Sequence, residues 1–361
     1  MKILIVKPSS LGDIVQALPV LRFLKRYLPG SEIYWWVDSA FAPLLEGDPD
    51  LAGIVRFERR RWAEPKHWPE LWRSIRCLRA EVFDWVIDLQ SLARSGAVAW
   101  LANGKLTVGL DEPREGARGF YDLIVPRPSF HTHAVDWYLG VLPLLGLPRP
   151  DPSASASQGA MSSGFGFGEN FHWLALRPEV ASNIRQKWAV NGSRWLVLQP
   201  GARWQNKRWP AEHFAELVCL LSERQSNLTF AILGTEQDRP LGKLIAEACP
   251  DRCVDLTGKI SLLEMVEWIR LADLLVTNDT GPMHVAAALN TPLVALFGPT
   301  EPRRTGPYGQ LTHVLQLQLP CEPCLRPRCY YSRPIECLRA ISASEVVQAV
   351  EQRLGASGKA F

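Results

Sequence analysis

The stretch LLVTNDTGPMHVAAALNTPLVALF, residues 274–297, decides the fold class of this 361-residue chain. Its apolar runs Leu274–Thr277 and Leu293–Phe297 predict buried strands, and Pro282–Leu289 between them predicts a helix. A strand, a short loop, a helix and a second strand form a unit whose two strands run parallel. We therefore expect an α/β protein with a parallel sheet that helices cover on both faces.

The same alternation extends outward from this stretch. Further strands are predicted at Lys2–Val6, Glu32–Val37, Trp85–Leu89, Leu106–Leu110, Trp195–Gln199 and Leu228–Leu233. Helices are predicted from Leu11 onward and at Trp68–Arg79, Leu92–Leu101, Ala211–Ser222, Leu241–Ala248 and Leu262–Leu271. The chain thus divides into two α/β halves, and two facing sheets of this kind would form a ligand cleft between them.

A segment rich in Pro, Ser and Gly separates the halves. It reads PRPDPSASASQGAMSSGFGFG at residues 148–168, a composition typical of a linker or mobile loop. We expect an N-terminal domain over residues 1–150 and a linker over 151–175. A C-terminal domain is expected over 176–342, followed by a C-terminal helix and tail over 343–361.

The composition excludes several classes of protein. Hydrophobic residues make up 47% of the chain and charged residues 21%, so the chain can bury a full core. A net charge of +3 is too small to indicate a nucleic-acid partner. No apolar stretch reaches about 18 residues, and the first apolar run is too short for a signal peptide. These features predict a soluble, cytoplasmic protein.

The eight cysteines do not form the pattern of a disulfide framework. Four of them crowd into Cys321-x₂-Cys324-x₄-Cys329-x₇-Cys337. Of the others, Cys77, Cys219 and Cys249 lie singly or far apart, and Cys253 is four residues past Cys249. Four thiols are enough for a tetrahedral zinc site, although the later spacings do not fit a standard zinc finger. The sequence leaves zinc binding open, and we assign no metal to the expected site.

Parallel sheets bind ligands beyond the carboxyl ends of their strands, so the loops that follow strands are expected to carry the chemistry. The first such loop is PSSLGD, residues 8–13. Gly12 permits close approach of a ligand to the backbone. Asp13 suits two roles, a cap on the following helix or a general base that takes a proton from a substrate hydroxyl.

Two loops of the second half suit a bound diphosphate. The loop QPGARWQNKRWP, residues 199–210, holds Arg203, Lys207 and Arg208, although a solvated surface loop would have a similar composition. In TNDTGPMH, residues 277–284, Asp279 and Thr280 are capping residues, and Gly281 and Pro282 open a helix whose free N–H groups favour an anion. His284 falls in the first turn of that helix, and a buried structural histidine is the alternative.

A further loop, GTEQD at residues 234–238, offers a carboxylate that could accept hydrogen bonds from ribose hydroxyls. The first strand-to-helix turn lacks the G-x-G-x-x-G fingerprint, and the chain lacks the P-loop pattern G-x-x-x-x-G-K-[ST]. These absences argue against a nicotinamide enzyme and against a P-loop NTPase.

Six motifs together resemble glycosyltransferase family 9, the ADP-heptose:lipopolysaccharide heptosyltransferases, and its heptosyltransferase I type above all. In chain order they are KPSSLGDIVQALP, VIDLQSLARSG, HAVDWY, PGARWQNKRWP, NDTGPMHVAAAL and LFGPTEPRRTGPYG. The resemblance implies a GT-B architecture, in which two Rossmann-like, doubly wound domains face a cleft. It places the acceptor on the N-terminal domain and the nucleotide-sugar on the C-terminal one.

The resemblance also implies roles for single residues. Asp13 matches the catalytic base, Lys207 the lysine that contacts phosphate, and Asp238, or else Glu236, the acid that holds the donor ribose. Asp279, Thr280, Gly281 and His284 match the donor motif, and Arg203 adds positive charge there. Inverting displacement at an anomeric carbon needs no redox cofactor, and with these cations it needs no metal. The helix near Ser344–Leu354 is implied to pack toward the N-terminal domain.

The acceptor side is expected at a basic segment of the first half. Residues 56–79 hold seven Arg and one Lys together with Trp62, Trp68 and Trp72. Because the family acts on a lipid-anchored, acidic glycan, we expect acceptor contacts, or contacts with an anionic surface of the inner membrane, from Arg59, Arg60, Arg61 and Lys66. Ser10 and Gly12 are also placed on the acceptor side. The alternative is a solvated basic face whose tryptophans pack inward.

Three other functions remain open from the sequence. One is a GT-B glycosyltransferase, or a related epimerase, that uses another nucleotide-sugar. Another is a noncatalytic nucleotide-binding or glycan-binding protein, which would tolerate loss of Asp13. The third, a zinc-bearing nucleic-acid binder, rests on the cysteines and the basic segment and is disfavoured by the near-neutral net charge.

Overall fold

The computed structural model describes residues 1–112, 115–150, 171–175, 177–188 and 194–356. The chain forms two compact units, Met1–Ala175 and Leu176–Phe361. Most of the predicted linker, residues 151–170, lies outside the described residues. None of the described helices is both long and apolar enough to span a bilayer.

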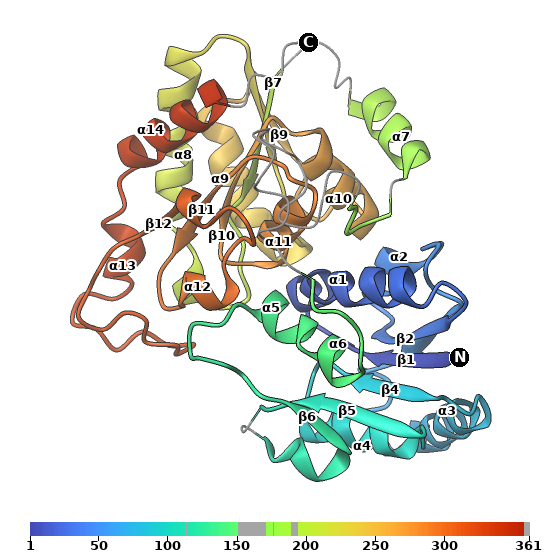
Figure 1. Ribbon diagram of the computed structural model, residues 1–361. Helices are drawn as coiled ribbons and strands as arrows, with labels where there is room; N and C mark the ends of the chain where they lie inside the picture. The colour runs from blue at the N-terminus through green and yellow to red at the C-terminus, as the bar shows by residue number, and fades with distance from the viewer. Residues whose placement is uncertain (113–114, 151–170, 176, 189–193, 357–361) are drawn as a thin grey trace. The chain divides into compact units, whose positions relative to one another are not determined.

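Unit 1 is built on a six-stranded sheet of order β3-β2-β1-β4-β5-β6, and all its strands are parallel. The strands are β1 (Lys2–Val6), β2 (Glu32–Asp38), β3 (Gly53–Phe57), β4 (Trp85–Asp88), β5 (Leu106–Leu110) and β6 (Leu123–Val125). The helices are α1 (Leu11–Tyr27), α2 (Ala42–Leu45), α3 (Trp68–Ala80), α4 (Ala93–Leu101), α5 (Ala134–Leu139) and α6 (Val141–Leu144). Helices α1 and α5 cover one face of the sheet, and α3 and α4 cover the other (Figure 1).

Unit 2 repeats this topology with the sheet order β12-β11-β10-β7-β8-β9. Its strands are β7 (Arg194–Gln199), β8 (Leu228–Ile232), β9 (Cys253–Asp255), β10 (Leu274–Asn278), β11 (Leu293–Phe297) and β12 (Val314–Gln316). Its helices are α7 (Pro178–Trp188), α8 (Ala211–Arg224), α9 (Arg239–Ala248), α10 (Leu262–Leu271), α11 (Gly281–Ala288), α12 (Pro302–Thr305), α13 (Glu336–Arg339) and α14 (Ala343–Ala356). In chain order both sheets read 3-2-1-4-5-6, the doubly wound order, which confirms the predicted α/β fold class.

This topology indicates where a ligand site is expected. The strand order reverses between β1 and β4 in unit 1 and between β7 and β10 in unit 2. Ligands of doubly wound sheets bind at such switch points, beyond the carboxyl ends of the strands. Asp13 lies in the first turn of α1 directly after the β1 loop, and Lys207 and Asp279 lie in the segments that follow β7 and β10. Each unit thus places its candidate residues at its own switch point.

The central strands agree with their predicted positions, and the strands without a prediction are the edges of the sheets. These are β3, β6, β9 and β12. Only one of their residues, Val125, is fully buried. An edge strand packs on one side only, so its sequence lacks the continuous apolar run that marks a central strand.

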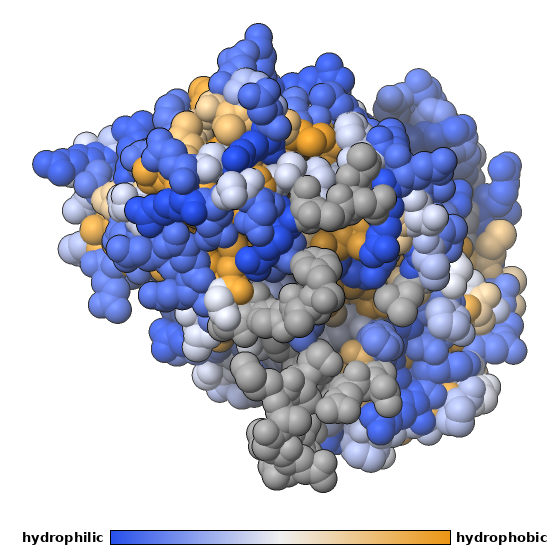
Figure 2. Space-filling view, turned by 90° about the horizontal axis from the view of Figure 1, so that it is seen from above, coloured by the Kyte–Doolittle hydropathy of each residue, from blue (hydrophilic) through white to orange (hydrophobic). Residues whose placement is uncertain are grey.

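The last helix, for which the resemblance implied packing toward the N-terminal domain, packs on the core of unit 2. Helix α14 buries Val346, Val347, Val350 and Leu354 in the core of unit 2. There it packs on α8 and on strands β10 and β11. The apolar side of the helix covers a face of the second sheet that would otherwise meet water. On the face seen in Figure 2, hydrophilic side chains predominate and apolar side chains lie in small groups among them.

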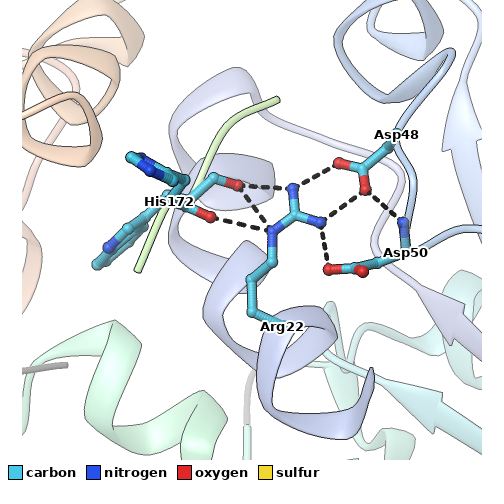
Figure 3. Close-up of polar contacts among 5 residues, drawn as sticks. Arg22, Asp48, Asp50 and His172 are labelled. Carbon is cyan, nitrogen blue, oxygen red and sulfur yellow. Dashed lines mark hydrogen bonds and ion pairs between the residues drawn. The ribbon is translucent and has the colours of Figure 1, made fainter. Parts of the chain in front are cut away.

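Arg22, a largely buried residue of helix α1, fastens the last described segment of unit 1 to that helix. The Arg22 guanidinium pairs with Asp48 at 2.5 Å and with Asp50 at 2.7 Å, and it donates to the carbonyl of Trp173 at 2.9 Å (Figure 3). Residues 171–175 continue this contact, since Phe171 stacks on Phe23 with ring centroids 4.9 Å apart. The planar fork of an arginine can satisfy several acceptors at once, which a lysine could not.

We expect Arg22→Met to lower the free energy of unfolding of unit 1 by about 3–5 kcal/mol, because Asp48 would stay buried without its partner. Urea unfolding followed by tryptophan fluorescence measures the change. The matched control is Arg56→Met, whose pair with Glu46 is exposed and whose loss should cost less than about 1 kcal/mol. Equal losses in both variants would contradict the importance given to burial.

Candidate functional site

The candidate donor site begins with a buried asparagine at the end of β10. The Asn278 side chain is fully buried and donates from Nδ2 to the carbonyl of Pro200 at 2.8 Å. Its Oδ1 accepts the backbone N–H of Trp209 at 3.0 Å. Both partners belong to the loop between β7 and α8, so Asn278 holds the two ends of that loop against β10.

This arrangement brings Lys207 and Asp279 together. The Lys207 ammonium lies 2.6 Å from Oδ2 of Asp279, and the Thr300 hydroxyl donates to the same oxygen at 2.6 Å. The ammonium also lies 4.8 Å from the ring centroid of Trp204. Lys207 remains 18% exposed while Asp279 is 6% exposed. An ammonium has three donors, so Lys207 can bind an anion while Asp279 fixes its position.

The other residues of the donor motif surround the start of α11. Thr280 is the N-cap residue in extended conformation, and Gly281 is the first residue of the helix. His284 lies in the first turn and is buried. The N-terminus of a helix offers free N–H groups and the positive end of the helix dipole, which together favour an anion such as a phosphate.

Asp238 is buried and lies beside the loop between β7 and α8, which carries Lys207. Its carboxylate accepts the N–H and the hydroxyl of Thr235 at 2.9 and 2.8 Å, and Arg208 lies 3.6 Å away. Gly201 permits this approach, since a Cβ there would lie 2.6 Å from the carboxylate. The alternative residue, Glu236, is 67% exposed and pairs with Arg239. Arg203 is exposed.

In unit 1 Asp13 lies half-buried at the start of α1. Its Oδ2 accepts the N–H of Ser10 at 2.8 Å and the Ser10 hydroxyl at 2.6 Å, which closes a capping box. Ser10 is exposed and Gly12 is buried. The capping role inferred from the sequence is therefore present, and it leaves the role of general base as a proposal.

A lysine near Asp13 is buried, and the sequence predicted no role for it. Lys7 follows β1, is 3% exposed, and donates from Nζ to the carbonyl of Leu89 at 2.8 Å and to the Tyr138 hydroxyl at 3.0 Å. Burial lowers the pKa of Lys7, but the nearby acidic groups, Tyr138, Asp13 and Asp88, outweigh it and raise the pKa above its ordinary value. Lys7 thus stays charged and adds positive potential near Asp13.

Three residues of the candidate sites for which the sequence predicted no role share one feature, their position after a strand. Lys7 stands directly after a buried strand, Asn278 ends another, and Thr300 follows a third after a short loop. A polar side chain at the carboxyl end of a central strand lies at the ligand edge of the sheet. All three residues lie within the six motifs, but no role was predicted for them.

The four basic residues expected at the acceptor lie together on one exposed segment between β3 and α3, apart in the sequence from Ser10 and Gly12. Arg61 pairs with Glu70 and Lys66 with Glu64, each at 2.6 Å. Arg59 and Arg60 are exposed. The inward packing considered for the tryptophans holds for Trp62 alone, which is 9% exposed and packs on Phe57. Trp68 and Trp72 are 52% and 53% exposed, so that alternative is wrong for them.

The four clustered cysteines line one small cavity of about 20 Å³. Asn206 and Glu322 line the same cavity, and all four thiols are free of disulfide bonds. Among the residues that the structure describes, no three His, Cys, Asp or Glu side chains are placed to hold a metal ion. The geometry therefore does not support the zinc site that the spacing left open.

Comparison with known proteins gives consistent results. Residues 71–333 match the family described as glycosyltransferase family 9 (heptosyltransferase). Lipopolysaccharide heptosyltransferase 1 of Pseudomonas aeruginosa is 32% identical and aligns over 92% of this chain and 88% of its own length. Lipopolysaccharide heptosyltransferase 1 of Escherichia coli K12 is 27% identical, with 86% and 92% covered.

Solved structures agree with these matches. The E. coli heptosyltransferase WaaC with ADP superposes with a TM-score of 0.74 at 26% identity, covering 98% of this chain and 100% of that chain. The same enzyme with ADP-2-deoxy-2-fluoro heptose gives a TM-score of 0.72 at 25% identity, with 98% and 99% covered.

We expect Asn278→Ala to lower the free energy of unfolding of unit 2 by about 2–5 kcal/mol, because it leaves a buried carbonyl and a buried N–H without partners. Urea unfolding measures this cost. Gln205→Ala is the control from the same loop, since Gln205 is exposed and its truncation should cost less than about 0.5 kcal/mol. A stable Asn278→Ala variant would show that the loop does not depend on this side chain.

Proposed function

The chain belongs to glycosyltransferase family 9, the heptosyltransferases, and on that basis we propose that it transfers a heptose from ADP-heptose to the inner core of lipopolysaccharide. The acceptor would be of the Kdo–lipid A type, which is a lipid-anchored acidic glycan. WaaC has been captured with ADP and with an ADP-heptose analogue, and its likeness to this chain supports ADP-heptose as the donor.

One observation carries the donor assignment. The loops after β7 and β10 place the Lys207 ammonium 2.6 Å from Asp279, at the start of α11. A departing diphosphate develops negative charge, and preorganised donors at that position would stabilise the transition state. Asp279 orients Lys207, while Arg203, Thr280, Gly281 and His284 would contact the phosphates. Asp238 would hold the ribose.

The proposed step is a single displacement. Asp13 takes the proton of the acceptor hydroxyl, whose oxygen attacks the anomeric carbon as the bond from that carbon to the diphosphate oxygen breaks. ADP leaves with the electron pair of that bond, and the configuration inverts. Lys7 supports this role because its buried ammonium places positive charge near Asp13. No metal is needed where Lys207 and the α11 N-terminus supply the positive potential.

The test incubates the protein with ADP-heptose and a deacylated inner-core acceptor in the presence of EDTA. We expect ADP release together with a product heavier by one heptose. If ADP-heptose gives no turnover and another nucleotide-sugar does, the donor assignment is wrong. If no nucleotide-sugar is turned over, the protein is a noncatalytic binder.

We expect Asp13→Asn to lower kcat about 10²–10⁴-fold, the usual contribution of a general base. An amide oxygen can still accept the Ser10 N–H, so the helix cap and the free energy of unfolding should change little. ADP affinity, measured by calorimetry, serves as the control and should stay within about twofold. A kcat close to that of the unchanged protein would remove Asp13 from the mechanism.

Arg59→Glu combined with Arg60→Glu should raise the acceptor KM about tenfold or more, because two exposed cations become anions facing an anionic substrate. The KM for ADP-heptose should not change. Steady-state kinetics with each substrate varied in turn separates the two effects. Equal increases in both KM values would show that these arginines do not act on the acceptor. We also propose that Arg59, Arg60, Arg61 and Lys66 can contact an anionic surface of the inner membrane.

A further inference from the structure

Two exposed tryptophans on α3 are not explained by the packing of unit 1. Trp68 and Trp72 lie one helical turn apart and are more than half exposed, whereas Ile75 and Leu78 of the same helix are buried in the core. Residues four apart in a helix share a side, so the two indole rings form one exposed aromatic surface. Exposed large aromatic pairs of this kind mark a surface that meets another phase or partner.

The charge around this pair is positive and largely uncompensated. Residues 56–79 carry seven Arg and one Lys against three Glu. Two of those glutamates, Glu64 and Glu70, already pair with Lys66 and Arg61. Arg73 and Arg76, on the same helix as the tryptophans, are exposed and have no ion-pair partner among the described residues.

An open groove runs beside the helix. It lies between β3 and α3, has a volume of about 610 Å³, and is lined by Arg56, Arg61, Glu70 and Arg73 together with Ser74 and Cys77. Arg56 and Arg61 already pair with Glu46 and Glu70. Guanidinium groups bind phosphate with bidentate geometry, so Arg73, which has no ion-pair partner among the described residues, is suited to contact a phosphate-bearing headgroup.

We propose that Trp68 and Trp72, flanked by Arg73 and Arg76, dock the protein on the surface of an anionic phospholipid bilayer. Tryptophan is favoured at the level of the headgroups, where its ring meets the acyl boundary and its N–H meets water. Arginines beside it add electrostatic attraction to anionic lipids. The proposal rests on the proposed function in one respect, since a lipid-anchored acceptor requires the enzyme to work at such a surface.

The test measures binding of the full chain to vesicles by co-sedimentation. Vesicles of phosphatidylcholine alone are compared with vesicles in which a third of the lipid is phosphatidylglycerol. We expect binding to the anionic vesicles that weakens strongly at high salt. Trp68→Ser with Trp72→Ser should weaken it about tenfold or more, and Arg73→Gln with Arg76→Gln should weaken it about fivefold per arginine.

The matched control is Trp100→Ser, which removes a tryptophan of similar exposure, 60%, from a different helix. Its vesicle binding should equal that of the unchanged protein. A second readout uses Cys77, which is more exposed than the other cysteines, labelled with an environment-sensitive dye. The dye should shift to the blue with anionic vesicles, and a Cys77→Ser variant checks that the label is at this site.

Three results would overturn the proposal. The first is anionic-vesicle binding that is unchanged by loss of both tryptophans. The second is loss of turnover on the soluble, deacylated acceptor in the Trp68→Ser, Trp72→Ser variant, which would assign the pair to acceptor recognition. The third is tighter binding to a single-stranded oligonucleotide than to vesicles. Vesicle binding without any turnover would support the docking surface and contradict the proposed function.

Discussion

The two hydrogen bonds of the Asn278 carboxamide are the constraint on which the candidate donor site depends. A fully buried amide must satisfy its donor and its acceptor within the protein, because no water replaces a lost partner. Both partners are backbone groups near the ends of the loop after β7. The loop is thereby held in the conformation that carries Lys207 to Asp279. Side chains that contact no ligand can in this way determine the geometry of those that do.

The two units use the same topology to place a lysine in two different settings. Lys7 is buried, and its ammonium is engaged by a carbonyl and a phenol, so it acts on its surroundings through charge. Lys207 is held from one side by Asp279 and keeps part of its surface exposed, so it can contact a ligand directly. Exposure, which the sequence does not reveal, separates an electrostatic role from a binding role.

The sequence predicts the centre of each sheet well and its edges poorly, for a physical reason. Central strands such as β1 and β10 are covered on both faces and appear as continuous apolar runs. Edge strands such as β3 and β12 are half-buried and look like loops. Motifs also identify Lys207 and Asp279 singly. Their contact depends on Asn278 and Thr300, whose hydrogen bonds join segments far apart in the chain.

The chemistry of the surface is the property that composition predicts least well. A net charge of +3 suggests a nearly neutral protein, but the ion pairs of Glu64 and Glu70 leave several arginines near α3 uncompensated. The sequence likewise gives Trp62 and Trp72 the same alternative of packing inward, although one packs on Phe57 and the other faces solvent. What a surface can bind follows from the charges and rings left over after internal contacts are formed. That remainder is a property of the folded chain, so it is read from the structure and not from residue counts.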